Sequence, residues 1–377
     1  MNEVLNEIKK LRKDNTLHID RTNKNPYRLV VNEEDGSRTA YYFSVPIYNL
    51  NTRRLLRPCF VNVQGGYIYA GSTAEITVRG DTFYCRSKSA ACHIVFDGGV
   101  FQENNGVLQN DLFSLSATLN GVACCGRQEK DATAKCVLHM ETPVMSVRSN
   151  GRSFSLMNSE FHPSVTLSGI AGLDSFGCAV ASLDIHYRNL SEKDYEIEIF
   201  ANSSYCQKVL FEINMHISKL FQDTTVSSLQ ADANNAFGGV AYIGNTARFG
   251  EEWLYTRLDY DYMKEMIGRE IRRTILHLPK WDNCSVPLSA FSVTSRFCSF
   301  GSTWNNRVQE TYKIGDSMID KGYHHIDLSG YLVDDRVRAL QHREGMILRS
   351  KEKDSGCTIV STGDSYCAPQ ILEINYR

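Results

Sequence analysis

The sequence of 377 residues lacks any apolar run that approaches the ~20 residues needed to cross a bilayer. It also lacks an excess of charge of either sign, because 41 basic residues stand against 43 acidic ones and the net charge is −2. Such a balance gives no electrostatic field that would attract nucleic acid or anionic lipid. We therefore expect a globular chain with no membrane span and no nucleic-acid partner.

A continuous apolar segment typical of secretory signals is missing from the N-terminus, MNEVLNEIKKLRKDNTLHID. Either a leader has been trimmed or the Sec route is not used. Short metal-ligand spacings are missing too, since the twelve cysteines include no CxxC pair. Several of them, such as Cys85, Cys92 and Cys136, lie within apolar strand-like runs. This placement favours reduced core thiols over a disulfide framework or a zinc site.

Recognisable catalytic motifs are absent: the sequence contains no GxSxG, HExxH, P-loop or GxGxxG. The nearest grouping is His324, His325 and Asp327. Neighbouring residues of a strand point to opposite faces, so only His325 and Asp327 share one, and two ligands are too few for zinc. We expect no enzymatic activity and no cofactor, although the converging carboxylates of a hydrolase cannot be identified in a linear sequence.

What the sequence does contain is a long region with a period of two, from about residue 25 to 215. Apolar residues alternate with polar ones in runs such as FSLSA at 113–117 and YEIEI at 195–199. Turn signals rich in Gly and Asn separate these runs. The pattern predicts an all-β fold of two antiparallel, jelly-roll-like β-sandwich domains. The predicted division is an N-terminal arm at 1–20, a first sandwich at 21–219 and a second at 220–377.

The N-terminal arm has the spacing of a short amphipathic helix. Val4, Leu5, Ile8 and Leu11 fall on one stripe. Because so short a helix is marginal alone, it must dock on its own domain, a sister subunit or another partner. We predict an interface with a neighbouring molecule, and packing against its own domain remains the alternative.

The C-terminal part carries a series of short strings that follow one another in a recognisable order. They are DTTV at 223–226, TRLD at 256–259, IRRTILHL at 271–278, STWNN at 302–306, YHHIDL at 323–328, GMILR at 345–349 and PQILEINY at 369–376. In this order they resemble the DNRLRE family of bacterial surface and extracellular modules. The resemblance implies a jelly-roll-like sandwich at 220–377 and an outside location, on a cell or on a particle.

Two kinds of binding site are conceivable from single residues. A flat indole beside polar groups suits a sugar ring, and Trp253, in a loop-like context with Tyr255 nearby, is the best candidate, whereas Trp304 is expected in the core. Asp223, Asp259 and Asp261 are weak calcium candidates, with turn capping as the alternative role.

These observations favour a structural or adhesive subunit over other classes of protein. Nineteen tyrosines and seventeen phenylalanines offer contact area, and the low net charge lowers the barrier to self-association. We expect a homo-oligomer or filament with a possible cell-surface partner. The alternative is a carbohydrate-binding module that recognises glycans through loop aromatics. The expected location is extracellular or on a cell or particle surface, with cytoplasmic synthesis of reduced cysteines as a further possibility.

Overall fold

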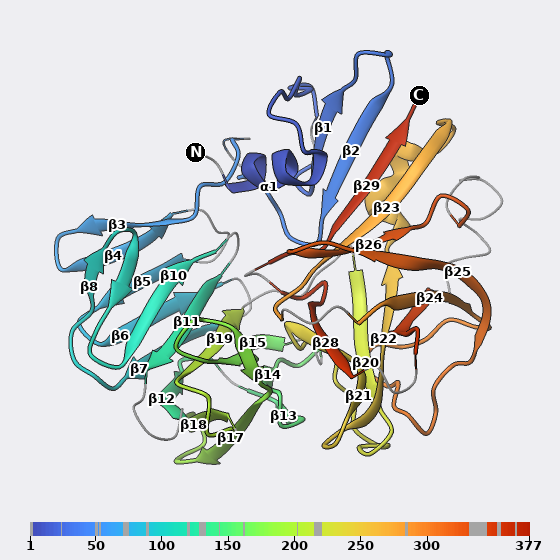
Figure 1. Cartoon of the computed structure of the whole chain (residues 1–377). Coiled ribbons are helices and arrows are strands. Elements are labelled where there is room, and N and C mark those ends of the chain that lie inside the picture. Colours follow the sequence, from blue (N-terminus) through green and yellow to red (C-terminus); the bar gives the residue numbers. More distant parts are fainter. Residues whose placement is uncertain are drawn as a thin grey trace. The chain divides into compact units, whose positions relative to one another are not determined.

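A computed structural model describes residues 3–377 except 24, 50, 51, 53, 71–74, 88–89, 119–120, 128–132, 143, 161–162, 202, 215–220, 283–285, 332–344, 353–355 and 366–367. The described chain is nearly all β, with antiparallel sheets in sandwich-like arrangements and a short helix at the N-terminus, so the predicted fold class is confirmed (Figure 1). It divides into two compact units. Unit 1 comprises Met1–Leu55, Ser218–Ala236 and Ala241–Arg377, and unit 2 comprises Leu56–Ile217 and Phe237–Val240.

Unit 1 is built from both ends of the chain. Its elements are α1 (Glu3–Arg12), β1 (Arg28–Asn32), β2 (Arg38–Phe43), β20 (Phe221–Ser227), β21 (Val240–Thr246), β22 (Gly250–Leu258), η1 (Tyr260–Met266), β23 (Ile271–Pro279), β24 (Leu288–Val293), β25 (Glu310–Ile319), β26 (Tyr323–Asp327), β27 (Met346–Ser350), β28 (Cys357–Ser361) and β29 (Ile371–Tyr376). The strands follow the order β1-β2-β29-β23-β26-β25-β24-β27-β22-β21-β28, and β20 pairs with β22.

The long strand β25 joins the two layers of unit 1. Its first part pairs with β24 and its last part, at Ser317–Ile319, pairs with β26. Leu276 and Leu372 from one layer meet Leu254 and Leu348 from the other in a common core. The period-two pattern of β29 explains this packing, because Leu372, Ile374 and Tyr376 all point to the core while Glu373 lies on the opposite face.

Unit 2 is a sandwich of two antiparallel sheets. Its elements are β3 (Cys59–Val63), β4 (Gly66–Ala70), β5 (Glu75–Arg79), β6 (Thr82–Arg86), β7 (Ala91–Phe96), β8 (Gln102–Asn104), β9 (Val107–Gln109), β10 (Phe113–Ala117), β11 (Val122–Arg127), β12 (Thr133–Met140), β13 (Ser146–Ser149), β14 (Ser153–Met157), β15 (Pro163–Leu173), β16 (Ala179–Ala181), β17 (Leu183–Asn189), β18 (Asp194–Ala201) and β19 (Lys208–Asn214). One sheet has the order β17-β18-β12-β7-β6-β5-β4-β3, and the other β13-β14-β15-β19-β11-β10-β9-β8, with β16 on β15.

The core of unit 2 lies between its two sheets. Phe83 and Ile197 come from the first sheet, and Leu115 and Phe211 from the second. Cys92, in β7, is a free thiol inside this core, and burial raises its pKa to about 12. A thiol in this environment is the small buried hydrophobe that the sequence predicts.

The observed units differ from the predicted division. The segment 21–55 was assigned to the first sandwich, but β1 and β2 belong to unit 1, because β2 pairs with β29 from Arg38↔Tyr376 to Phe43↔Ile371. The predicted arm at 1–20 belongs to the same unit. The chain passes from unit 2 back to unit 1 between β19 and β20, close to the predicted boundary at 220.

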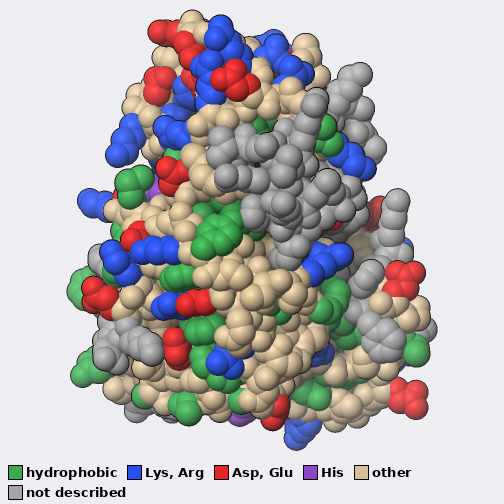
Figure 2. Space-filling model, turned by 90° about the vertical axis from the view of Figure 1, so that its right-hand side faces the viewer, with side chains coloured by type: hydrophobic (Ala, Val, Ile, Leu, Met, Phe, Trp, Pro, Cys, Tyr) green, Lys and Arg blue, Asp and Glu red, His purple; other side chains and the backbone are tan. Residues whose placement is uncertain are grey.

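The surface of the chain is mixed in character where it can be seen. On the face drawn in Figure 2, Lys and Arg side chains are interspersed with Asp and Glu side chains, most densely at the top, and apolar side chains form small separate patches. Among the described residues, no helix has the length and apolar character needed to cross a membrane.

Candidate functional site

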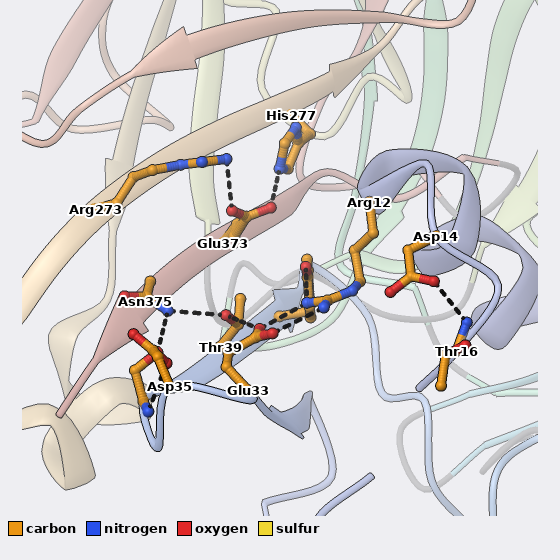
Figure 3. A network of polar contacts seen from close by, with 12 residues as sticks. Arg12, Asp14, Thr16, Glu33, Asp35, Thr39, Arg273, His277, Glu373 and Asn375 are labelled. Carbon is orange, nitrogen blue, oxygen red and sulfur yellow. Dashed lines mark hydrogen bonds and ion pairs between the residues drawn. The ribbon is translucent and has the colours of Figure 1, made fainter. Parts of the chain in front are cut away.

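A row of polar side chains lies on the face of β23, β26 and β29 that points away from the core of unit 1. The register of the sheet creates it: β23 pairs with β26 so that His277 faces His325, and β29 runs along the other side of β23 with Glu373 opposite Ile275. Figure 3 shows the side chains of His277 and Arg273 converging on Glu373 from one strand. Three strands distant in sequence therefore place two imidazoles and a carboxylate side by side.

Four of these groups form a continuous line of hydrogen bonds, which we call the histidine chain: Glu373, His277, His325 and Asp320. Glu373 Oε2 lies 3.2 Å from His277 Nε2, and the Nδ1 atoms of His277 and His325 lie 2.7 Å apart. His325 Nε2 lies 2.9 Å from Asp320 Oδ2. The line runs from a buried carboxylate to one that is exposed to solvent.

Further polar groups flank both ends of the histidine chain. Arg273 Nη2 donates to Glu373 Oε1 at 3.0 Å. The ring of Tyr323 stacks on His325, with centroids 5.7 Å apart, and its hydroxyl donates to a carboxylate oxygen of Glu7 in α1. The N-terminal helix α1 is thus connected to the histidine chain through Tyr323.

Burial and contacts with oppositely charged partners shift the pKa values of these groups in opposite directions. Burial lowers the pKa of His277, against the effect of its contact with Glu373. Burial is the largest single influence on the pKa of Glu373 and of Asp320, and it acts to raise both. The hydrogen bonds from the histidines, together with the charges of Arg273 and Arg12 at Glu373 and the backbone N–H donors at Asp320, outweigh burial, so both pKa values lie below their ordinary range. Both carboxylates are therefore ionised acceptors at neutral pH.

The arrangement uses every ring nitrogen of the two histidines. Each nitrogen of His277 and of His325 already has a protein partner, either a carboxylate or the other ring. A general base or a metal ligand needs a nitrogen directed at its substrate or ion. In this geometry the histidine chain is suited to holding a proton and joining strands, and not to reacting with a bound molecule.

The helix α1 docks on its own unit. Val4 and Ile8 are buried, and Leu5 and Leu11 are half-buried. Arg12 at the end of the helix forms a fork with the two oxygens of Glu33 at 2.7 and 2.8 Å (Figure 3). The prediction that this stripe contacts a neighbouring molecule is therefore wrong for Val4 and Ile8, because their side chains are already covered within unit 1.

Glu33 connects the helix to the sheet. It accepts a hydrogen bond from Thr39 Oγ1 at 2.5 Å, and Arg12 Nη1 also reaches the hydroxyl of Tyr41 at 3.4 Å. The hydrogen bonds between Arg12 and Glu33 raise the pKa of Arg12. They also lower the pKa of Glu33, against the effect of burial. In Figure 3 this group lies next to Asn375, which donates to Thr39.

The pair of adjacent histidines behaves as strand geometry predicts, but with other partners. His324 points to the opposite face from His325, is buried, and contacts Ser317 Oγ and Thr358 Oγ1, each at 3.2 Å. Burial lowers its pKa to about 4. The sequence paired His325 with Asp327, whereas its contacts are His277 and Asp320. Those two partners could be found only with the strand register known.

The aromatic residues proposed for ligand binding have different environments. Trp253 is half-buried, its indole N–H donates to Glu251 at 2.8 Å, and its ring centroid lies 5.1 Å from that of Trp304. The guanidinium of Arg307 lies 4.1 Å from the Trp304 ring. Tyr255 is fully buried and donates its hydroxyl to Val308 O at 2.6 Å, so its predicted role in ligand contact is wrong.

The three aspartates proposed for calcium do not act as a set. Asp223 is buried and accepts hydrogen bonds from Gly363 N and from Gln370 Nε2. Asp259 is half-buried, and the side chain of Asp261 lies outside the described residues. Within the part of the chain that the structure describes, no group of three or more His, Cys, Asp or Glu side chains is arranged to hold a metal ion.

Unit 2 presents an uncharged sheet edge. Among the described residues, strand β3, with the sequence CFVNV, pairs with β4 and with no other strand. Val61 of this strand is 46% exposed and faces Ile68 of β4, which is 43% exposed. The same row continues across the sheet through Thr77 to Tyr84. The opposite edge, β17, carries the exposed side chains of His186 and Arg188 on its outer face.

Comparison with known proteins does not extend these observations. No protein-family model matches the chain, and no curated protein matches it.

Proposed function

We propose that this chain is a non-enzymatic structural or adhesive subunit that associates with copies of itself through the edge strand β3 of unit 2. The observation that carries the proposal is the uncharged edge with its exposed row, Val61 and Ile68. Such an edge offers unpaired backbone groups to another strand, and soluble proteins usually block edges with charge, proline or a covering segment. The exposed Arg188 on the outer face of β17 illustrates that protection at the other edge.

A second copy of the chain fits this edge. If β3 pairs antiparallel with β3 of another copy about a twofold axis at Val61, then Cys59 faces Val63 and Phe60 faces Asn62 across the interface. No like charges meet in this register. The near-zero net charge adds little repulsion between copies.

The proposal extends to the class and location expected from the sequence. We retain the likeness of 220–377 to DNRLRE modules as a hypothesis, supported by antiparallel strands β20 to β29 in that region. With it we propose a place on a cell or particle surface. The use of both histidines by protein partners supports a role without catalysis.

The test is the mass of the full chain in solution. We expect light scattering after size exclusion to give at least twice 42.6 kDa for the wild type. Val61→Lys should weaken association at least tenfold, about 1.4 kcal/mol, because a charge is placed at the centre of the interface. Leu190→Lys is the matched control, since Leu190 is 49% exposed beside the opposite edge. A wild-type monomer at high concentration, or equal effects of the two variants, contradicts the proposal.

A second candidate function is glycan binding at Trp253. The observation in its favour is the half-buried pair Trp253 and Trp304 with Arg307 beside it, because indole faces and a guanidinium suit a sugar ring and its hydroxyl groups. A glycan array of the wild type tests it. Hits that disappear with Trp253→Ala support this function, and an array without hits removes it.

A further inference from the structure

The histidine chain contains three hydrogen bonds, and each one needs a proton. They join Glu373 to His277, His277 to His325, and His325 to Asp320. Both carboxylates are ionised and can only accept. A neutral imidazole carries one N–H and an imidazolium carries two, so the number of protons on the two rings decides how many of the three bonds can form.

One charge state satisfies all three bonds. Two neutral rings bring two protons, which leaves one contact between two lone pairs. Two imidazolium rings bring four protons, which places two N–H groups against each other across the 2.7 Å between the Nδ1 atoms of His277 and His325. One neutral ring with one imidazolium brings three protons, one for each bond.

The surroundings decide which ring carries the charge. The side chain of His277 is 4% exposed and that of His325 is 16% exposed. Burial disfavours the charged form of His277 and lowers its pKa. His325 also stacks on the ring of Tyr323, a favourable position for a cation. His277 is then the neutral ring with its proton on Nε2, and His325 donates from both nitrogens.

We propose that His277 and His325 hold one shared proton between Glu373 and Asp320, and that this proton-bound pair fastens the N-terminal helix α1 to its sheet. The connection runs through Tyr323, whose ring stacks on His325 and whose hydroxyl donates to Glu7 of α1. Burial raises the pKa of Tyr323, so its hydroxyl keeps the proton that it donates. Loss of the shared proton weakens both the line of hydrogen bonds and the stack beneath the helix.

Charged groups from every neighbouring element act on this pair. In addition to the two carboxylates, they are Glu7 and Arg12 from α1, Tyr41 from β2, Arg273 from β23, and His324 with Lys280 from the side of the core. Arg273 favours ionised Glu373, and the neutral state of His324, whose pKa is about 4, adds no competing charge near neutral pH.

The pH dependence follows from these directions. The folded pKa of His277 lies below the unfolded value of ~6.5, so the stability that its neutral form contributes is present above ~6.5 and is lost as the pH falls. The lowered pKa values of Glu373 and Asp320 act in the same sense at lower pH. We therefore expect α1 to be held less firmly as the pH falls below ~6.5.

The first experiment reads the protons directly in the full wild-type chain. With ¹⁵N-labelled histidine, nitrogen chemical shifts at pH 7 distinguish neutral rings from imidazolium rings. We expect His277 to be neutral with Nε2–H and His325 to be cationic. Two neutral rings or two cationic rings at pH 7 overturn the proposal, whatever the effect of any variant.

The second experiment measures hydrogen exchange of the amides at 3–12, corrected for the intrinsic rate at each pH. Protection in the wild type should fall as the pH falls below ~6.5. His325→Gln and Tyr323→Phe should each lower it at least tenfold at pH 7, and the second variant retains the ring and its packing. His18→Gln, an exposed histidine, is the control. Unchanged protection in Tyr323→Phe, or equal loss in the control, refutes the role in fastening the helix.

Discussion

Replacement of Asp223 by Asn should stabilise unit 1 at neutral pH. The carboxyl group is buried, and burial raises its pKa from 3.8 to about 6. A raised carboxyl pKa means that ionisation is unfavourable in the folded state. At pH 7 the ionised group therefore lowers the free energy of unfolding by about 3 kcal/mol, from about 2 pKa units at ~1.4 kcal/mol each. The amide oxygen of Asn can still accept from Gly363 N, and the amide nitrogen can face the hydroxyl of Thr256.

The stability difference between Asp223→Asn and the wild type should depend on pH with a definite sign. In the wild type, stability is gained as the pH falls through about 6 toward 4, because the folded carboxyl group takes up a proton before the unfolded one does. Asn cannot take up this proton. The variant should therefore exceed the wild type by up to ~3 kcal/mol at pH 7, and the difference should nearly disappear at pH 4.

Urea unfolding followed by tryptophan fluorescence is a suitable assay. All three tryptophans, Trp253, Trp281 and Trp304, lie in unit 1, so the signal reports on this unit. Asp327→Asn, at an exposed position in the same unit, is the control and should change little. A destabilised variant at pH 7, or an equal difference at pH 7 and pH 4, would refute the reasoning.

Three further predictions concern the packing of side chains within each unit. Ile8→Ala removes a fully buried side chain of α1 and should cost unit 1 ~2–5 kcal/mol by the same fluorescence assay. Gly172→Ala places a methyl group 2.7 Å from the sulfur of Cys206, so calorimetry should show unit 2 losing ~1–3 kcal/mol. In the native protein, mass spectrometry should find a thiol reagent on exposed Cys298 well before buried Cys92, whose pKa is about 12.

Each of these has an outcome that contradicts it. Lys10→Ala, on the exposed side of α1, should stay within about 0.5 kcal/mol of the wild type, and an effect equal to that of Ile8→Ala would disprove the docked helix. Gly322→Ala meets open space and should be neutral in calorimetry. Equal labelling rates for the two cysteines would show that the core of unit 2 opens readily.

Strand positions could be predicted from the sequence because a period of two is a local signal. Leu372, Ile374 and Tyr376 face the core as their alternation indicates. The partner of a strand is not a local property, and this explains the error over residues 21–55. The run RTAYYF fits a strand in either sandwich, and its pairing with β29 depends on residues more than 300 positions away.

The site was predicted less well for the same reason. Alternation places Trp253 and Tyr255 on one face of β22, but it does not reveal that Phe297 packs on Tyr255 and covers that part of the face. For the histidine chain, the signal in the sequence was a polar residue, His277, at an alternating position of an apolar strand. Its meaning appeared only when the register placed it opposite His325.

The pairing of β2 with β29 also has a consequence for biosynthesis. Unit 2 is largely one continuous stretch, Leu56–Ile217, so it can fold on the ribosome while the remainder of the chain is still being made. Strand β2 emerges earlier but must wait for β29, and the contact between Ser37 and Asn375 spans 338 positions. During that interval Tyr42, which is later fully buried, is exposed to chaperones and to other nascent chains. The time between the first and last strands of unit 1 is therefore the period in which this protein is most vulnerable to misassembly.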